Sequence, residues 1–418
     1  MPRKRWFKLA LASLFALSAS HCLAQDSVYA PCEPDSFFTG SVEYLLFTRD
    51  ADITNPGPVI GGPNTGLLTF GDTNFDYQSG FRVMLGYSSN GARVEGVFAN
   101  FGTWNYNSVG SLTSGLSFDE GINAGNPWAG SNFINLTTGF QGLHGAASGG
   151  LGGDADEFEG LGPNVPFPAD AFPTYEVYYK STLHSFELNL WTEDPDSFVQ
   201  FGAGYRYLSL DEVAGTEING VFRAADVAAP NNGLSHASLI GAGGLTFLGG
   251  TANGFEDENG NASGLPDNLQ MIQEARTTND LNGVQLMAQP EIMYWRGWVV
   301  NGVIKAGIYH NSVSGSVTER YVGTDPGVGG DTSIYGRTFS DSKDSLAFAG
   351  ALGIQSDFPL SENWSLIGGY EMLLIHGVAL GPEQFAALKG ALPGQVYDVD
   401  THGQIIAHGA NVGLQFTY

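Results

Sequence analysis

The last nine residues of the chain alternate strictly between apolar and polar positions. The apolar members are Ala410, Val412, Leu414, Phe416 and Tyr418, and the polar side holds Asn411, Gly413, Gln415 and Thr417. Because successive side chains of a β-strand point to opposite faces, this pattern predicts a strand with one apolar and one polar face. A terminal strand of this kind is typical of an outer-membrane barrel, where lipid covers one face and the lumen the other.

Further strand-like segments precede this one and bring the expected total to about ten. They cover residues 41–49, 80–88, 92–101, 186–190, 199–207, 282–289, 298–311, 346–356 and 364–376. Most match the roughly nine to eleven residues that a tilted strand needs to cross the hydrocarbon. The segments therefore predict an all-β protein built from membrane-crossing strands.

The connections between these segments alternate in length. Short turns rich in Gly, Pro, Asn and Asp lie at 89–91, 193–196, 295–297 and 357–363, and the long connections cover 50–78, 102–178, 211–280, 312–344 and 377–403. Tight turns on one side and long loops on the other are expected of an up-and-down antiparallel barrel with short periplasmic turns and long extracellular loops. A β-sandwich has no reason to place every long loop at one end.

The predicted number of strands is ten to twelve. The stretches 216–226, 314–322 and 333–340 could either extend neighbouring hairpins or add a pair of strands. In the last long connection, residues 382–389 fit a short helix with Pro382 in its first turn. The longest connection, 102–178, contains Trp104 and Trp128 and is expected to fold over the mouth of the barrel or inward.

The N-terminus resembles a secretory signal peptide. Arg3, Lys4, Arg5 and Lys8 precede an apolar run, 9–19, and a small-residue cleavage site ends at Ala24. That run is about half of the roughly twenty residues that a membrane-spanning helix requires. We therefore expect Sec-dependent export, with a signal peptide at 1–24, an N-terminal tail at 25–36 and an outer-membrane barrel at 37–418.

Charge and cysteine content exclude two other classes. The chain carries 17 Lys and Arg against 43 Asp and Glu, a net charge of −26. The signal segment removes four basic and no acidic residues, so the mature chain holds 13 against 43, a net charge of −30. So acidic a protein is not expected to bind nucleic acid, and Cys32 alone cannot form an intrachain disulfide.

Five blocks of sequence, taken in order, resemble a known family. They are 41–46 (SVEYLL), 79–87 (SGFRVMLGY), 205–212 (YRYLSLDE), 305–311 (KAGIYHN) and 369–380 (GYEMLLIHGVAL). Together they are similar to the β-barrel porin family that is widespread in planctomycetes, from about residue 37 to the C-terminus. The resemblance implies an outer-membrane barrel located in the cell outer membrane, and it leaves the function open.

Charged residues recur on the predicted lumen face of these strands. The candidates are Glu43, Arg82, Arg93, Glu95, Glu187, Arg206, Lys305 and Glu371. Four acids and four bases could line an ion-sorting pore, or they could pair and fill the lumen. Eight-stranded barrels are filled by side chains and open channels appear at sixteen or more strands, so ten to twelve strands favour a filled or narrowly open interior.

The remaining acidic residues are expected in the long loops. Candidate cation-binding groups there are Asp154, Asp156, Glu157, Glu159 and Glu256–Glu258, although none completes a calcium-loop pattern. An acidic mouth would concentrate cations and repel anions. Trp191, Trp295, Trp298 and Trp364 near strand ends are expected in the interfacial aromatic girdle.

The leading functional prediction is porin-like passive passage of small solutes or ions, mildly favouring cations. The alternative is a structural or surface-interaction barrel with a closed lumen, and the third is a barrel-embedded hydrolase. The chain contains no G-x-S-x-G, H-E-x-x-H or P-loop motif, so we expect no enzyme, no cofactor and no protein-bound metal. Expected partners are outer-membrane lipid and the barrel-assembly machinery, which would recognise the C-terminal strand with Val412, Leu414, Phe416 and Tyr418. The oligomeric state stays open.

Overall fold

The computed structural model describes a single closed β-barrel. The described residues are 36–53, 70, 73–111, 174–193, 197–222, 267–325, 331–389 and 396–418, so the predicted signal peptide lies outside them. The barrel strands are β1 (Ser36–Asp52), β2 (Gln78–Ser89), β3 (Ala92–Ser111), β4 (Thr174–Thr192), β5 (Val199–Phe222), β6 (Asp267–Trp295), β7 (Trp298–Asp325), β8 (Asp331–Pro359), β9 (Trp364–Val378) and β12 (Gly403–Thr417).

These ten strands form an up-and-down antiparallel barrel, as predicted. Each strand lies beside its neighbour in sequence, and β12 closes the sheet by pairing antiparallel with β1, from Thr39 opposite Thr417 to Asp52 opposite Gln404. A two-stranded sheet, β10 (Leu388–Lys389) and β11 (Val396–Tyr397), lies outside the barrel's hydrogen-bonded ladder. No described helix is long and apolar enough to cross a membrane.

Two hairpin turns explain why the short connections can be so short. Asn90 and Gly91 have φ values of 52° and 75°, and Arg296 and Gly297 have 53° and 85°. Two consecutive residues with positive φ are what a two-residue type I′ turn requires, and this turn matches the twist of the strands it joins. Asn and Gly adopt this conformation at little cost, whereas Arg296 is an unusual residue for it.

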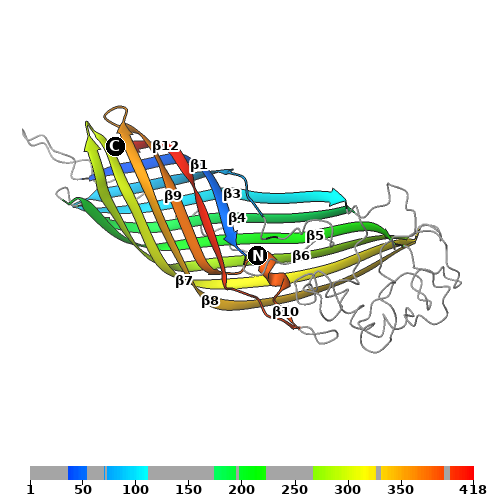
Figure 1. Cartoon of the computed structure of the whole chain (residues 1–418). Coiled ribbons are helices and arrows are strands. Elements are labelled where there is room, and N and C mark those ends of the chain that lie inside the picture. The colour runs from blue at the N-terminus through cyan, green and yellow to red at the C-terminus, as the bar shows by residue number, and fades with distance from the viewer. Residues whose placement is uncertain are drawn as a thin grey trace, which may run out of the picture. The chain divides into compact units, whose positions relative to one another are not determined.

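The strands are much longer on one side of the barrel than predicted. β6, β7 and β8 contain 29, 28 and 29 residues, whereas β9 and β12 contain 15 each. Figure 1 shows β3 to β8 continuing well past the ends of β1, β9 and β12. The predicted long loops at 102–178, 211–280 and 312–344 are therefore partly wrong, because their first and last parts continue the hairpins. For the same reason the twelve-strand alternative is wrong.

The outer surface of the barrel changes character along the strands. A belt of exposed apolar side chains surrounds the half of the barrel next to the short turns. Each strand contributes to it, for example with Val42, Leu85, Val94, Leu190, Phe201, Leu286, Ile304, Leu352, Leu366 and Leu414. Farther along β4 to β8 the outward positions become polar, as in Lys180, Asp211, Arg276, Ser314 and Ser342. We call these polar extensions of β4–β8 the tall wall.

The predicted helix at 382–389 is only partly correct. A single turn of 3₁₀ helix, η4 (Pro382–Phe385), begins with Pro382 and is followed by the short strand β10 at Leu388. The four residues of η4 are buried, because this turn lies against the inner faces of β6 and β7.

Candidate functional site

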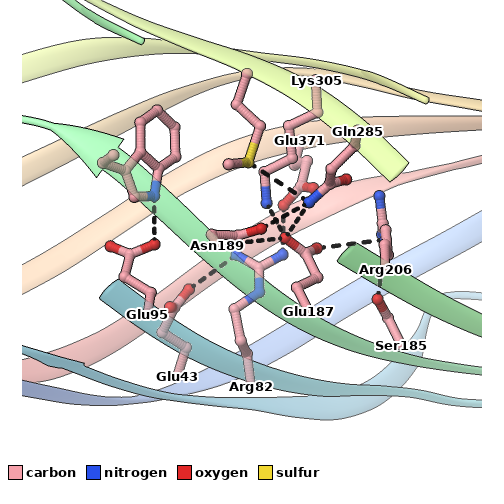
Figure 2. Close-up of polar contacts among 12 residues, drawn as sticks. Glu43, Arg82, Glu95, Ser185, Glu187, Asn189, Arg206, Gln285, Lys305 and Glu371 are labelled. Carbon is pink, nitrogen blue, oxygen red and sulfur yellow. Dashed lines mark hydrogen bonds and ion pairs between the residues drawn. The ribbon is translucent and has the colours of Figure 1, made fainter. Parts of the chain in front are cut away.

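All eight charged candidates lie on the inner face of the barrel. Figure 2 shows Glu43, Arg82, Glu187, Arg206, Lys305 and Glu371 pointing toward one another from different strands. Together with Arg93 and Glu95 they form a cross-section that we call the charged layer.

Glu187 on β4 is the centre of the charged layer. Its carboxylate lies 2.8 Å from the Lys305 ammonium nitrogen and 3.3 Å from Nε of Arg206. The amide groups of Asn189 and Gln285 also donate to it, at 3.0 and 2.9 Å. A carboxylate with this many donors is fully compensated for its burial, and removal of the carboxylate would leave two cations without their partner.

Arg82 on β2 forms the second part of the charged layer. Its guanidinium contacts the Glu43 carboxylate at 3.3 Å and also forms an ion pair with Glu371 on β9. Asn411 donates to Glu43 at 2.5 Å. Because β1 and β12 lie between β2 and β9 in the sheet, the Arg82–Glu371 pair bridges two non-adjacent strands across the inside of the barrel.

Trp191 was expected in the interfacial girdle, and this expectation is wrong. Its side chain is buried inside the barrel, where the indole N–H donates to Glu95 at 2.7 Å. The Arg93 guanidinium lies over the indole ring at 5.6 Å and pairs with Glu95 at 2.8 Å. Trp191 has the same strand parity as Glu187, which could have indicated its inward direction. Trp295 and Trp364 are exposed on the outside.

An apolar cluster fills the barrel next to the charged layer. Side chains from β1, β3 to β9 and β12 contribute to it, including Leu45, Phe47, Leu183, Leu208, Leu281, Leu373, Ile375 and Ile405, each with no exposed surface. Trp104, which the sequence placed in a loop, belongs to β3 and donates its indole N–H to the Phe47 carbonyl at 2.9 Å. We call this cluster the apolar seal.

A segment of the β9–β12 connection packs on the far side of the apolar seal. Ala379 is held by β6, because its N–H donates to the side-chain oxygen of Asn279 at 2.8 Å and its carbonyl accepts from Asn279 and Thr277. Phe385 stacks on Phe70 from the β1–β2 connection, with ring centroids 6.0 Å apart. We call the residues 378–387 the inner strap.

A buried charged pair fixes the inner strap to the barrel. The Arg49 guanidinium on β1 forms an ion pair with Glu212 on β5, and both side chains have no exposed surface. Tyr179 donates to Glu212 at 2.7 Å, and the Gly381 N–H of the strap donates to the same carboxylate at 2.9 Å. Neither residue is among the eight charged candidates expected from the sequence. The only signal was that Arg49 and Glu43 share one strand face, whereas Glu212 lay in a predicted loop.

No group of three or more His, Cys, Asp or Glu side chains is placed to hold a metal ion within the described part of the chain. The acidic candidates Asp154, Asp156, Glu157, Glu159 and Glu256–Glu258 lie outside that part. The cation sites expected at these loops therefore remain sequence predictions.

The strand order, the filled interior and the apolar outer belt together define a closed ten-stranded antiparallel β-barrel. No protein-family model and no functionally characterised relative matches the chain, so membership of the planctomycete family stays a prediction. Among solved structures, the chain is similar to the outer membrane protease OmpT of Escherichia coli, with 6% identity and a TM-score of 0.37 over 94% of this chain and 99% of that one. A FadL homologue of Pseudomonas aeruginosa (10% identity, TM-score 0.26, 92% and 90% covered) and an anion-selective porin of Comamonas acidovorans (11%, 0.16, 92% and 99%) are also similar.

Proposed function

We propose that this protein is an outer-membrane barrel with a sealed lumen that carries the tall wall as a structural or surface-interaction element. The observation that carries the proposal is the apolar seal, whose buried side chains come from nine of the ten barrel strands, β1, β3 to β9 and β12. Ions and polar solutes cannot cross such a layer without being desolvated, and desolvation without compensation is costly. The proposal includes no catalytic step and no cofactor.

The outer belt supports the membrane location. Large apolar side chains on all ten strands are exposed on the outside, and a soluble protein would not leave so continuous an apolar surface in water. A closed antiparallel barrel is also one of the two structures that satisfy every backbone hydrogen bond in lipid. Membrane lipid is therefore the proposed partner of the belt, after export and removal of residues 1–24.

The tall wall supports the interaction role. At about 3.3 Å per residue, a strand of 29 residues such as β6 extends for roughly 95 Å, whereas a tilted strand crosses the hydrocarbon in about ten residues. More than half of each of the longest strands therefore lies outside the membrane. Because the long connections follow the tall wall, we infer that this side faces the cell exterior.

Cysteine labelling tests the location and the orientation. Cys32 is the only thiol of the predicted mature chain, so a Cys32→Ser background accepts single cysteines. A membrane-impermeant maleimide should label Ser314→Cys on the tall wall in intact cells. It should label Ser361→Cys in the β8–β9 turn only after the outer membrane is permeabilised. The opposite pattern, or labelling of neither site in membrane fractions, would contradict the proposal.

Conductance tests the sealed lumen. The refolded full-length protein should give no stepwise conductance in a planar bilayer, and proteoliposomes containing it should not swell in sugar solutions. A general porin reconstituted in parallel provides the positive control. Reproducible conductance steps from folded, heat-modifiable protein would refute the sealed lumen.

Passive passage of small solutes or ions is the second candidate function, and one observation favours it. A chamber of about 340 Å³ enters the barrel from the short-turn end and reaches the charged layer, so the rest of the path is closed by that layer, the apolar seal and the inner strap. Under this candidate, the acidic excess of the chain would favour cations mildly. A reversal potential measured across a KCl gradient tests that preference.

A further inference from the structure

The chamber at the short-turn end of the barrel is a second feature of the interior. Its volume is about 340 Å³, and residues of all ten barrel strands line it. Pockets for small ligands have volumes from about 300 Å³ upward. The chamber ends at the charged layer, so it is a blind pocket that opens away from the tall wall.

At the inner end of the chamber, the positively charged side chains are already paired with carboxylates. Arg82 pairs with Glu43 and Glu371, and Arg93 pairs with Glu95. Each lining cation therefore already has a carboxylate partner, as Lys305 has in Glu187. An anionic ligand would have to compete with these carboxylates for the cations, which makes anions poor candidates.

The mouth of the chamber is different, because it carries carboxylates in excess. Glu291 on β6 and Asp357 on β8 line it on either side of β7, where Glu291 lies opposite Asn301 and Asp357 lies opposite Val299. Neither carboxylate makes an ion pair with another described residue. The lining as a whole contains five acids, Glu43, Glu95, Glu291, Asp357 and Glu371, and three bases, Arg82, Arg93 and Lys305.

The uncharged part of the lining is mixed: amide and hydroxyl side chains such as Ser41, Gln200 and Gln355 stand beside several apolar ones. Phe37, Phe198, Val299, Val303 and Trp191 offer aliphatic and aromatic surface. A site with unpaired carboxylates at the rim, and with amide and hydroxyl acceptors beside apolar side chains on its walls, matches a short alkyl chain whose ammonium groups donate hydrogen bonds. Aromatic rings also attract such cations through their faces.

We propose that this chamber binds a small alkylammonium ligand, such as a linear diamine, with Glu291 and Asp357 as its charge partners. The site opens toward the periplasmic side of the proposed membrane orientation, so its ligand would come from that compartment. The inference goes beyond the proposed function. The binding site does not depend on that function, because the chamber exists whether or not the apolar seal opens; only the compartment of the ligand rests on the proposed orientation.

Three four-carbon probes separate charge from size. Putrescine, 1,4-butanediol and succinate have similar lengths and carry two positive, no and two negative charges. Binding to the detergent-solubilised full chain is measured by calorimetry and by the fluorescence of Trp191, compared with a Trp191→Phe variant that removes its signal. We expect putrescine alone to bind, and an increase in salt to weaken its binding.

The Glu291→Gln/Asp357→Asn double variant tests the two carboxylates. It should weaken putrescine binding about tenfold, as expected when two rim charges are removed. Asp344→Asn is the matched control, because it removes one acid from the exposed outer face of β8 and should leave binding unchanged. The heat-modifiable gel shift shows whether each variant is folded.

Several outcomes would overturn the inference. They are an absence of saturable putrescine binding at millimolar concentration, equal binding of butanediol or succinate, and unchanged affinity in the folded double variant. The conductance experiment is independent of all three, so failure of the binding site and failure of the sealed lumen are distinguishable.

Discussion

The guanidinium of Arg49 on β1 pairs with the carboxylate of Glu212 on β5 across the inside of the barrel, and neither side chain has any exposed surface. The strands β2, β3 and β4 separate the two in the sheet, so the pair connects distant parts of the wall. The same carboxylate accepts the Gly381 N–H of the inner strap. One buried ion pair thus links the barrel wall to the segment that covers the apolar seal.

Loss of one member of this pair should destabilise the barrel strongly. Arg49→Met leaves the Glu212 carboxylate buried without its cation, which costs about 3–5 kcal/mol in comparable cases. The Arg49→Met/Glu212→Gln double variant should lose less than the sum of the two single variants, because it buries no unpaired charge. Urea unfolding in lipid vesicles measures these free energies. Strictly additive losses would mean that the two groups do not interact.

The destabilisation caused by a charged residue on the outer surface should depend on its depth in the membrane. Ile304 faces outward near the middle of the belt on β7, so Ile304→Arg should destabilise the folded barrel by about 2–4 kcal/mol in lipid. Ser314 is ten residues farther along the same strand, on the tall wall, and Ser314→Arg should change stability by less than about 1 kcal/mol. If urea unfolding shows equal losses of unfolding free energy for both variants, the membrane does not distinguish Ile304 from Ser314 and the belt is not its location.

Tyr397 on β11 should make stability fall at high pH. Burial, together with the nearby carboxylates of Asp341, Asp400 and Asp398, raises the pKa of its hydroxyl above the usual value. In the unfolded chain tyrosine ionises near pH 10, so above that pH the unfolded state loses a proton that the folded state still holds. The contribution of Tyr397 is therefore fully present below pH 10 and is lost as the pH rises toward the raised pKa.

Comparison of two phenylalanine variants isolates this contribution. Above pH 10, the unfolding free energy of Tyr397→Phe should fall less steeply with pH than that of the wild-type protein, by up to the slope that one bound proton contributes. The lost hydrogen bond to Gln384 should add an offset that does not change with pH. Tyr77→Phe, at an exposed position, should leave the slope unchanged. If the two variants show the same slope, burial of Tyr397 has no effect on its titration.

The C-terminal strand should matter more for assembly in cells than for stability. Phe416 lies 4.9 Å from the Trp364 ring, and Tyr418 is largely exposed at the end of the chain. Phe416→Ser/Tyr418→Ser should lower the amount of folded protein in outer membranes several-fold while allowing refolding in detergent. Tyr44→Ser, at another exposed outward aromatic position, is the control. Normal membrane levels of the double variant would argue against recognition of this strand.

The sequence by itself determined the class of fold. The strict two-residue alternation of segments such as 410–418 specifies a strand with two chemically different faces, and short turns such as Asn90–Gly91 join such strands antiparallel. The inward direction of Glu187, Arg206 and Lys305 follows from the same alternation, because strand parity is a local property. An up-and-down antiparallel barrel of ten to twelve strands was therefore predictable from local patterns.

The tertiary structure decided how the inside is filled. The sequence left open whether 314–322 and 333–340 extend hairpins or add strands, and the extension of β6 is rich in Asp and Asn, which strands disfavour. These extensions are stabilised by pairing with one another. The contacts of Arg49 with Glu212 and of Ala379 with Asn279 join residues that are about 100 or more positions apart. The alternation of apolar and polar residues indicates which way a side chain points. It does not indicate which residue that side chain contacts, because the contact depends on the register and closure of the whole sheet.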